Sequence, residues 1–235
     1  MISYTYLLVN FFTIIICFVF SFHPRIRFDS YFAVFLKSAT IVAIPFLIWD
    51  ILFTKYGIWW FNTAYTLGIT IAKLPLEEWM FFYCIPFSCL FTYYCLTKFF
   101  DFSKINQFNK IIVLVSIAVC IGVAFMFPNK TYTFVTSMIT ICSLLFLQWI
   151  VKVDWIGQAS LVYCILMLGF FPVNGILTGT GIESPIVNYN PDAILNIRML
   201  TIPIEDVVYG YSMYLLNIYF FYQILNFQKN KIQMC

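Results

Sequence analysis

The sequence predicts an all-α membrane protein with seven transmembrane helices, arranged as two parallel three-helix repeats that a linking helix joins. Of the 235 residues, 63% are hydrophobic and 10% are charged, a composition that leaves no soluble domain beside the membrane part. Seven apolar runs approach the roughly 20 residues that a helix needs to cross a bilayer. A proline followed by two acidic residues also occurs twice, each time at the start of such a run.

The helices are expected in order along the chain, mostly with short connections. They are predicted over residues 4–22, 31–53, 76–96, 111–127, 133–151, 155–177 and 204–225. The first run is read as a retained helix and not as a signal peptide. No basic residue precedes it and it has no small-residue cleavage site, whereas the basic residues Arg25 and Arg27 follow it. Only two loops, 54–75 and 178–203, are long, and each leads into one acidic cluster.

The distribution of basic residues predicts the orientation. Nine lie in the first, third and fifth connections and near the C-terminus: Arg25, Arg27, Lys37, Lys98, Lys104, Lys110, Lys152, Lys229 and Lys231. Four lie on the other side: Lys55, Lys73, Lys130 and Arg198. The positive-inside rule therefore predicts an N-terminus outside and a C-terminus in the cytoplasm, in a bacterial inner or plasma membrane. This bias accounts for the net charge of +3, and the sequence indicates no nucleic-acid partner.

The two acidic clusters are the main candidates for chemistry. Glu77 and Glu78 follow Pro75, and Glu205 and Asp206 follow Pro203. Proline favours the first turn of a helix, where the free N–H groups and the dipole attract negative charge. Neighbouring helical residues point about 100° apart, so one acid of each pair can face the bundle interior while the other braces a loop. Acids in membrane helices are costly and usually functional, although these could serve only as favourable helix-start residues.

The two halves match when one is laid over the other. A shift of 124 places Asp50 on Asn174, Thr54 on Thr178 and Tyr65 on Tyr189, and a shift of 128 aligns the proline-acid-acid clusters. We therefore predict a first repeat over 1–100, a linking transmembrane helix over 101–130 and a second repeat over 131–235. The linking helix returns the chain across the bilayer, so the repeats have the same orientation.

Other kinds of site find little support. His23 is the only histidine and the eight cysteines show no C-x-x-C spacing, so no metal site is expected. The glycines at 175, 179 and 181 do not form a dinucleotide fingerprint, because they follow no strand. Aromatic residues gather near the acids, where their ring faces could stabilise a carbocation, or they could form an ordinary interfacial belt.

The quoted residues resemble the membrane-integral carotenoid cyclases. The features that carry the resemblance are Trp49-Asp50, Thr54, Gly57, Trp60-Phe61-Asn62 and Pro75-Leu76-Glu77-Glu78, repeated as Asn174, Thr178, Gly181, Tyr189 and Pro203-Ile204-Glu205-Asp206. In that family two homologous three-helix domains, separate or fused, form lycopene cyclase. The second half departs from the pattern. It has Glu183-Ser184-Pro185 in place of Trp-Trp-Phe, and Asn174 in place of an acid.

The resemblance implies a lycopene β-cyclase, an isomerase that turns the linear ψ-ends of lycopene into β-ionone rings. One acid protonates the terminal double bond and one carboxylate removes a ring proton, so no cofactor is required. We predict Glu78 and Asp206 as the acid/base pair, with Glu77 and Glu205 supporting them or exchanging roles. Further candidates for the substrate-binding site, some of which could instead be caps and loop residues, are Asp50, Thr54, Trp60, Asn62, Tyr65, Asn174, Thr178 and Tyr189.

Two other functions remain open at this point. A proton- or cation-coupled carrier would use paired acids at the interface of two repeats, but it predicts carboxylates near mid-bilayer in broken helices. A carotenoid-binding protein without catalysis would need the same apolar, aromatic cleft. A retinal protein is disfavoured because no lysine occurs between Lys152 and Lys229. The sequence leaves open the ring type, the number of ends cyclised, a C40 or C50 substrate and the oligomeric state.

Overall fold

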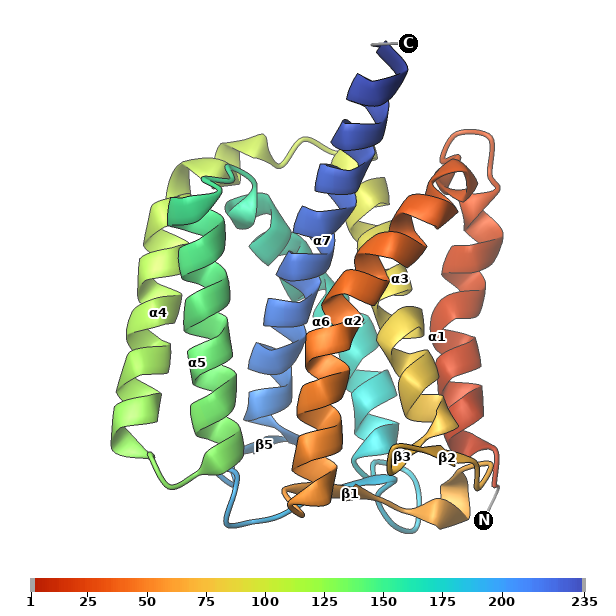
Figure 1. Ribbon diagram of the computed structural model, residues 1–235, viewed down its shortest axis with the longest axis vertical. Coiled ribbons are helices and arrows are strands. Elements are labelled where there is room, and N and C mark those ends of the chain that lie inside the picture. The colour runs from red at the N-terminus through yellow and green to blue at the C-terminus, as the bar shows by residue number, and fades with distance from the viewer. Residues whose placement is uncertain (1–2, 234–235) are drawn as a thin grey trace.

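The computed structural model describes residues 3–233, with side chains as far as residue 228. Within this part of the chain, seven long helices stand side by side and run between the two ends of the molecule (Figure 1). They are α1 Thr5–Ser21, α2 Phe32–Lys55, α3 Leu76–Phe99, α4 Asn109–Met126, α5 Thr131–Leu145, α6 Ile156–Leu177 and α7 Ile204–Gln233. Each overlaps one of the predicted apolar runs, so the predicted helical class is confirmed.

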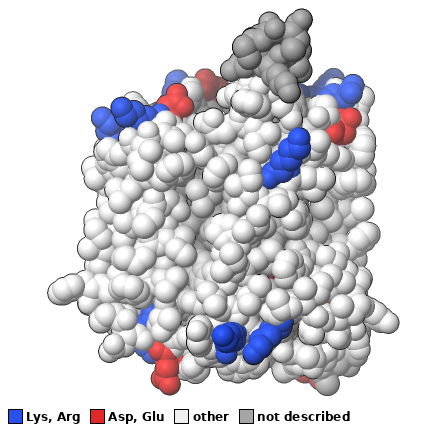
Figure 2. Space-filling model, in the orientation of Figure 1, with Lys and Arg blue, Asp and Glu red and all other residues white. Residues whose placement is uncertain are grey.

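The helices suit a membrane by length and composition. Five segments are long and apolar enough to span one, namely Phe28–Lys55, Leu76–Phe99, Ser103–Met126, Thr131–Ile150 and Ile156–Leu177. The first of these includes a 3₁₀ turn, η1 Phe28–Tyr31, and the third includes η3 Ser103–Phe108. Charged side chains gather at the two ends of the visible face and leave a broad uncharged belt between them (Figure 2). A belt of this kind is the surface that a lipid bilayer covers.

One predicted helix changes character near its end. The run expected over 133–151 begins as α5 and finishes in a π-helical turn, η4 Phe146–Ile150. There the Val151 N–H donates to the Phe146 carbonyl at 3.0 Å, a hydrogen bond across five residues. Such turns occur mostly as single insertions in α-helices.

The two long loops contain short strands that the sequence did not predict. Strand β1 Trp59–Phe61 from the first loop pairs antiparallel with β4 Val187–Tyr189 from the second, with Trp59 opposite Tyr189. Each loop also has a small hairpin of its own, which leads directly into a helix. The hairpins are β2 Thr70–Ile71 with β3 Leu74–Pro75, and β5 Arg198–Met199 with β6 Ile202–Pro203; a short 3₁₀ turn, η2 Thr63–Tyr65, follows β1. The strands lie at one end of the bundle, where they close it (Figure 1).

Helices from the two halves of the chain pack directly against each other. Helix α2 packs on α7, α5 packs on both α4 and α7, and α1 packs on α3. Phenylalanines such as Phe28, Phe87 and Phe221 fill the centre and are no more than 3% exposed. The rigid packing fixes the relative positions of the α3 and α7 starts, where the acidic clusters lie.

Candidate active site

An elongated cavity of about 520 Å³ lies between α1, α3, α6 and α7 and ends under β1 and β4. Asp50, Glu78 and Asp206 line it together with many apolar side chains. Both Glu78 and Thr92 of α3 line the cavity, which at 1.5 Å per residue corresponds to about 21 Å along that helix. The carboxyl groups are therefore at one end of a long apolar channel.

In the first half, the adjacent acids Glu77 and Glu78 point in different directions. The buried Glu78 lines the cavity and accepts a hydrogen bond from the Tyr6 hydroxyl of α1. Glu77 does not line it, and its Oε1 accepts a hydrogen bond from the backbone N–H of Leu67 at 2.6 Å. Its own carbonyl accepts from Asn10 Nδ2 at 2.8 Å. Glu77 thus ties the long loop and α1 to the start of α3.

The second half has a closely similar arrangement. Asp206 lines the cavity and accepts hydrogen bonds at 2.8 Å from the Tyr132 hydroxyl on Oδ1 and from the Tyr189 hydroxyl on Oδ2. Glu205 lies outside the lining, and its Oε1 accepts from Thr133 Oγ1 at 2.6 Å and from the Leu195 N–H at 2.7 Å. One acid of each pair therefore faces the cavity while the other holds a loop.

Several of these contacts recur at a constant spacing. The Glu77–Leu67 and Glu205–Leu195 hydrogen bonds both join residues ten positions apart. The hairpins recur in the same way, since Thr70 pairs with Pro75 and Arg198 with Pro203. Both contacts in the second half lie 128 positions after those in the first, the shift that aligns the two acidic clusters.

Asp50, near the end of α2, reaches the same end of the cavity. Its Oδ1 accepts hydrogen bonds from Trp59 Nε1 at 2.6 Å and from Thr54 Oγ1 at 3.5 Å. Its carboxyl group also interacts electrostatically with that of Glu78, which lines the same end of the cavity. Asn174, the matching residue of α6, lines the cavity as well.

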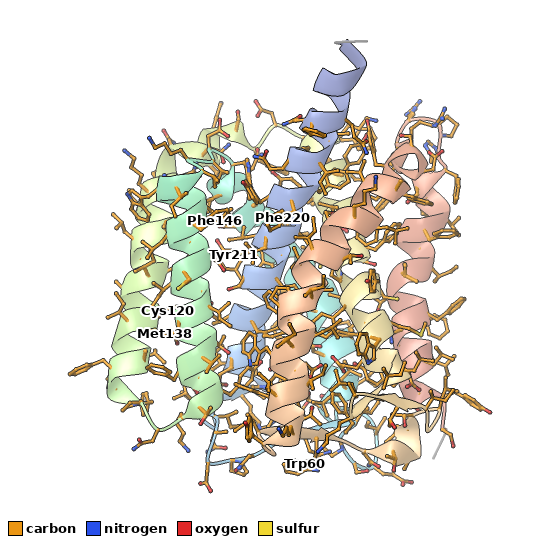
Figure 3. All side chains as sticks on the ribbon, in the orientation of Figure 1. Trp60, Cys120, Met138, Phe146, Tyr211 and Phe220 are labelled. Carbon is orange, nitrogen blue, oxygen red and sulfur yellow. The ribbon has the colours of Figure 1, made fainter. Side chains whose placement is uncertain are left out.

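The other predicted binding residues fall into two groups. Thr178 and Tyr189 line the cavity, and Thr178 also shares a hydrogen bond of 2.7 Å with Thr201. The lining does not include Thr54, Trp60, Asn62 or Tyr65. Asn62 and Tyr65 instead hold the second loop through Ser184, while Trp60 is 47% exposed at the loop end of the molecule (Figure 3).

Aromatic rings surround the carboxyl groups. Trp59, Phe61, Phe81 and Tyr209 line the cavity near them. Their ring faces could stabilise a positive charge without bonding to it. On the Asp206 side, Tyr132 stacks on Tyr189 with ring centroids 6.0 Å apart. Burial and the nearby Asp206 raise the pKa of Tyr189 well above its usual value, so this hydroxyl stays a neutral donor at physiological pH.

Two residues of this site were missed by sequence reasoning. Tyr6 and Tyr132 occupy the first turns of α1 and α5, and each donates to the cavity acid of its own half of the chain. Each lies inside or beside a mainly apolar run, where a single tyrosine gives no signal. Tyr132 lies 126 positions after Tyr6, a shift between the 124 and 128 that match the two halves. Comparing the halves at this shift could have identified both tyrosines.

The cavity opens sideways through the helix bundle. Phe12 of α1 and Leu168 of α6 line it and are also 66% and 78% exposed on the outer surface. Pro86 of α3 and Pro172 of α6 line its walls, where a missing backbone N–H interrupts the helical hydrogen bonds. This opening lies within the uncharged part of the helices and faces the space that lipid would occupy.

Comparison with known proteins shows that one protein-family model matches the chain. The family model described as lycopene cyclase matches residues 3–96 and 129–224, which together form most of the chain. The gap between the two segments contains α4. No curated protein and no solved structure matched the chain.

Proposed function

The chain belongs to the lycopene cyclase family, a family of carotenoid cyclases, and on this premise we propose that it converts the ψ-ends of lycopene to β-ionone rings. The observation that carries this proposal is the cavity that Glu78 and Asp206 line together at the end of an apolar channel. A linear polyene end fits such a channel, and an acid and a base at its end suffice for an isomerisation.

The reaction needs two proton transfers and no net redox change. A carboxylic acid protonates the terminal double bond and leaves a tertiary cation. The neighbouring alkene attacks that cation, which closes the ring and moves the charge to a ring carbon. A carboxylate then removes a ring proton, so the product is an isomer of the substrate. The rings of Trp59, Phe81 and Tyr209 are placed to stabilise the cation during these steps.

The two halves are proposed to be parallel repeats over 1–100 and 131–235, joined by the linking helix within 101–130. The recurring contacts at a spacing of 128 support this division. Because acids from both repeats line one shared site, the two ends of lycopene would be cyclised one after the other. The substrate would enter from the lipid through the opening at Phe12 and Leu168.

The proposal is tested by the pigments of lycopene-accumulating cells that express this chain, separated by liquid chromatography. We expect γ-carotene and β-carotene with the parent, and their loss in Glu78→Gln and Asp206→Asn at normal membrane levels. Glu183→Gln and Asp192→Asn make the same chemical changes in exposed loop acids and should keep the parental profile. Unchanged lycopene with a well-expressed parent would contradict the proposal, and ε-rings in the product would correct the ring type.

A further inference from the structure

The carboxyl groups of Asp50 and Glu78 form a pair in the cavity. They come from different helices, α2 and α3, line the same end of the cavity and interact electrostatically with each other. An ionised carboxylate can only accept hydrogen bonds, so two carboxyl groups can bond to each other only if one holds a proton. A hydrogen bond between Asp50 and Glu78 therefore requires one proton on the pair.

The other hydrogen bonds of the two carboxyl groups are consistent with one proton shared between them. Asp50 Oδ1 already receives the Trp59 N–H at 2.6 Å, whereas no donor among the described residues reaches the buried Oδ2. Glu78 Oε2 receives the Tyr6 hydroxyl. A proton held between Glu78 and Asp50 would satisfy Oδ2, and leaving that oxygen ionised without a donor would be costly.

The second half has no such pair. Both oxygens of Asp206 accept tyrosine hydroxyls at 2.8 Å, an arrangement that stabilises an ionised carboxylate. Arg198 adds a positive charge on this side, 5.9 Å from the Tyr189 ring centroid. At the position that matches Asp50 stands Asn174, and an amide cannot share a proton with Asp206 in this way.

We propose that Asp50 and Glu78 share one proton, that Glu78 donates it to the substrate, and that Asp206 is the base that removes the ring proton. Asp50 then acts as a positioning residue, which keeps Glu78 protonated and aimed. This inference rests on the proposed cyclase function and divides the roles within it. Each turnover moves one proton from Glu78 to Asp206, and the site is reset when that proton returns to Glu78 or exchanges with solvent.

Asp50→Asn tests the role of the pair. The amide would donate an N–H to Glu78 and favour its ionised form, so we expect cyclisation in membrane vesicles at pH 7 to fall about tenfold or more. Part of the rate should return as the pH is lowered, with little change in KM. The other titratable groups around the pair are tyrosines and Asp206: Tyr6, Tyr189, Tyr209 and Asp206.

Two variants serve as controls for this experiment. Asp50→Glu keeps the carboxyl group and should retain more activity than Asp50→Asn, with a pH profile closer to that of the parent. Asp192→Asn makes the same change in an exposed loop acid and should match the parent. A parental rate and pH profile in Asp50→Asn, or an equal and pH-independent loss in Asp50→Asn and Asp50→Glu, would overturn the inference.

Infrared spectroscopy provides a readout that does not depend on turnover. A protonated carboxyl group gives a carbonyl band of its own, which we expect in the purified parent at pH 7. It should disappear in Glu78→Gln and shift in Asp50→Asn. A parent without this band would overturn proton sharing even if it cyclises lycopene. A parent with the band but without cyclised product would instead contradict the proposed function.

Discussion

At the scale of single residues, neighbouring acids in one helical turn have separate tasks. Glu78 and Asp206 face the cavity, whereas Glu77 and Glu205 accept hydrogen bonds from loop N–H groups ten residues earlier. The rotation of about 100° between adjacent helical residues makes this separation unavoidable. Doubling the acid therefore supplies one group that faces the cavity, where the proposed chemistry would take place, and one group that holds the loop.

This separation predicts different effects of substitution at Glu77 and Glu78. Glu77→Ala removes the acceptor of the Leu67 N–H at 2.6 Å and should destabilise the protein by about 1–3 kcal/mol. We expect a lower melting temperature in detergent, while cyclisation per folded molecule falls much less than in Glu78→Gln. Glu183→Ala, in an exposed position, should change stability by no more than about 0.5 kcal/mol. A parental melting temperature together with lost cyclisation would place Glu77 in the chemistry instead.

The residues that sequence reasoning found, and those it missed, differ in a physical way. A proline followed by two acids in an apolar chain is unusual in itself, so the clusters were visible without any contact information. The tyrosines that hold the cavity acids were not, because Tyr6 and Glu78 lie 72 positions apart and Tyr132 and Asp206 lie 74 apart. A tyrosine beside an apolar run looks the same whether it faces lipid or a carboxylate.

At the scale of elements, the helices were predictable and the strands were not. Apolar runs of about 20 residues define the helices by length alone. The strands have two or three residues each, too few for an alternating pattern to appear. The turn between β2 and β3 also lacks the glycine that usually marks such a turn. Ala72 and Lys73 take its place and adopt positive φ values of 50° and 72°.

Helices α1 and α6 form the opening of the cavity, and Gly169 of α6 offers a way to narrow it. Gly169 lines the cavity, and a Cβ added there would meet nothing within 4 Å. The series Gly169→Ala, Gly169→Leu and Gly169→Trp should reduce kcat/KM stepwise, by about tenfold for Trp, without lowering the melting temperature.

The same series at Gly122 of α4 is a matched control. A Cβ there also meets nothing within 4 Å, but Gly122 is not among the residues that line the cavity. Its substitutions should leave kcat/KM near the parental value. If Gly169→Trp also keeps the parental kcat/KM, the substrate reaches the acids by another route.

At the scale of the whole molecule, the cavity is built from both halves of the chain. Glu78 and Asp50 come from the first half, Asp206 from the second, and strands β1 and β4 pair across the two long loops. Helix α2 also packs on α7, which continues this contact through the bundle. Neither half contains the pair of Asp50 and Glu78 together with Asp206.

This division predicts how the chain behaves when it is cut between α3 and η3, into residues 1–100 and 101–235. Either half alone should leave lycopene unchanged in lycopene-accumulating cells, because the first half lacks Asp206 and the second lacks Glu78 and Asp50. Expressed together, the halves should restore cyclised product, since helix packing and the β1–β4 pairing can hold them in place. The second half with Asp206→Asn should fail to complement the first. Cyclisation by one half alone would mean that two copies of the same acid suffice, and the asymmetry between the Asp50–Glu78 pair and Asp206 would then not be required for ring closure.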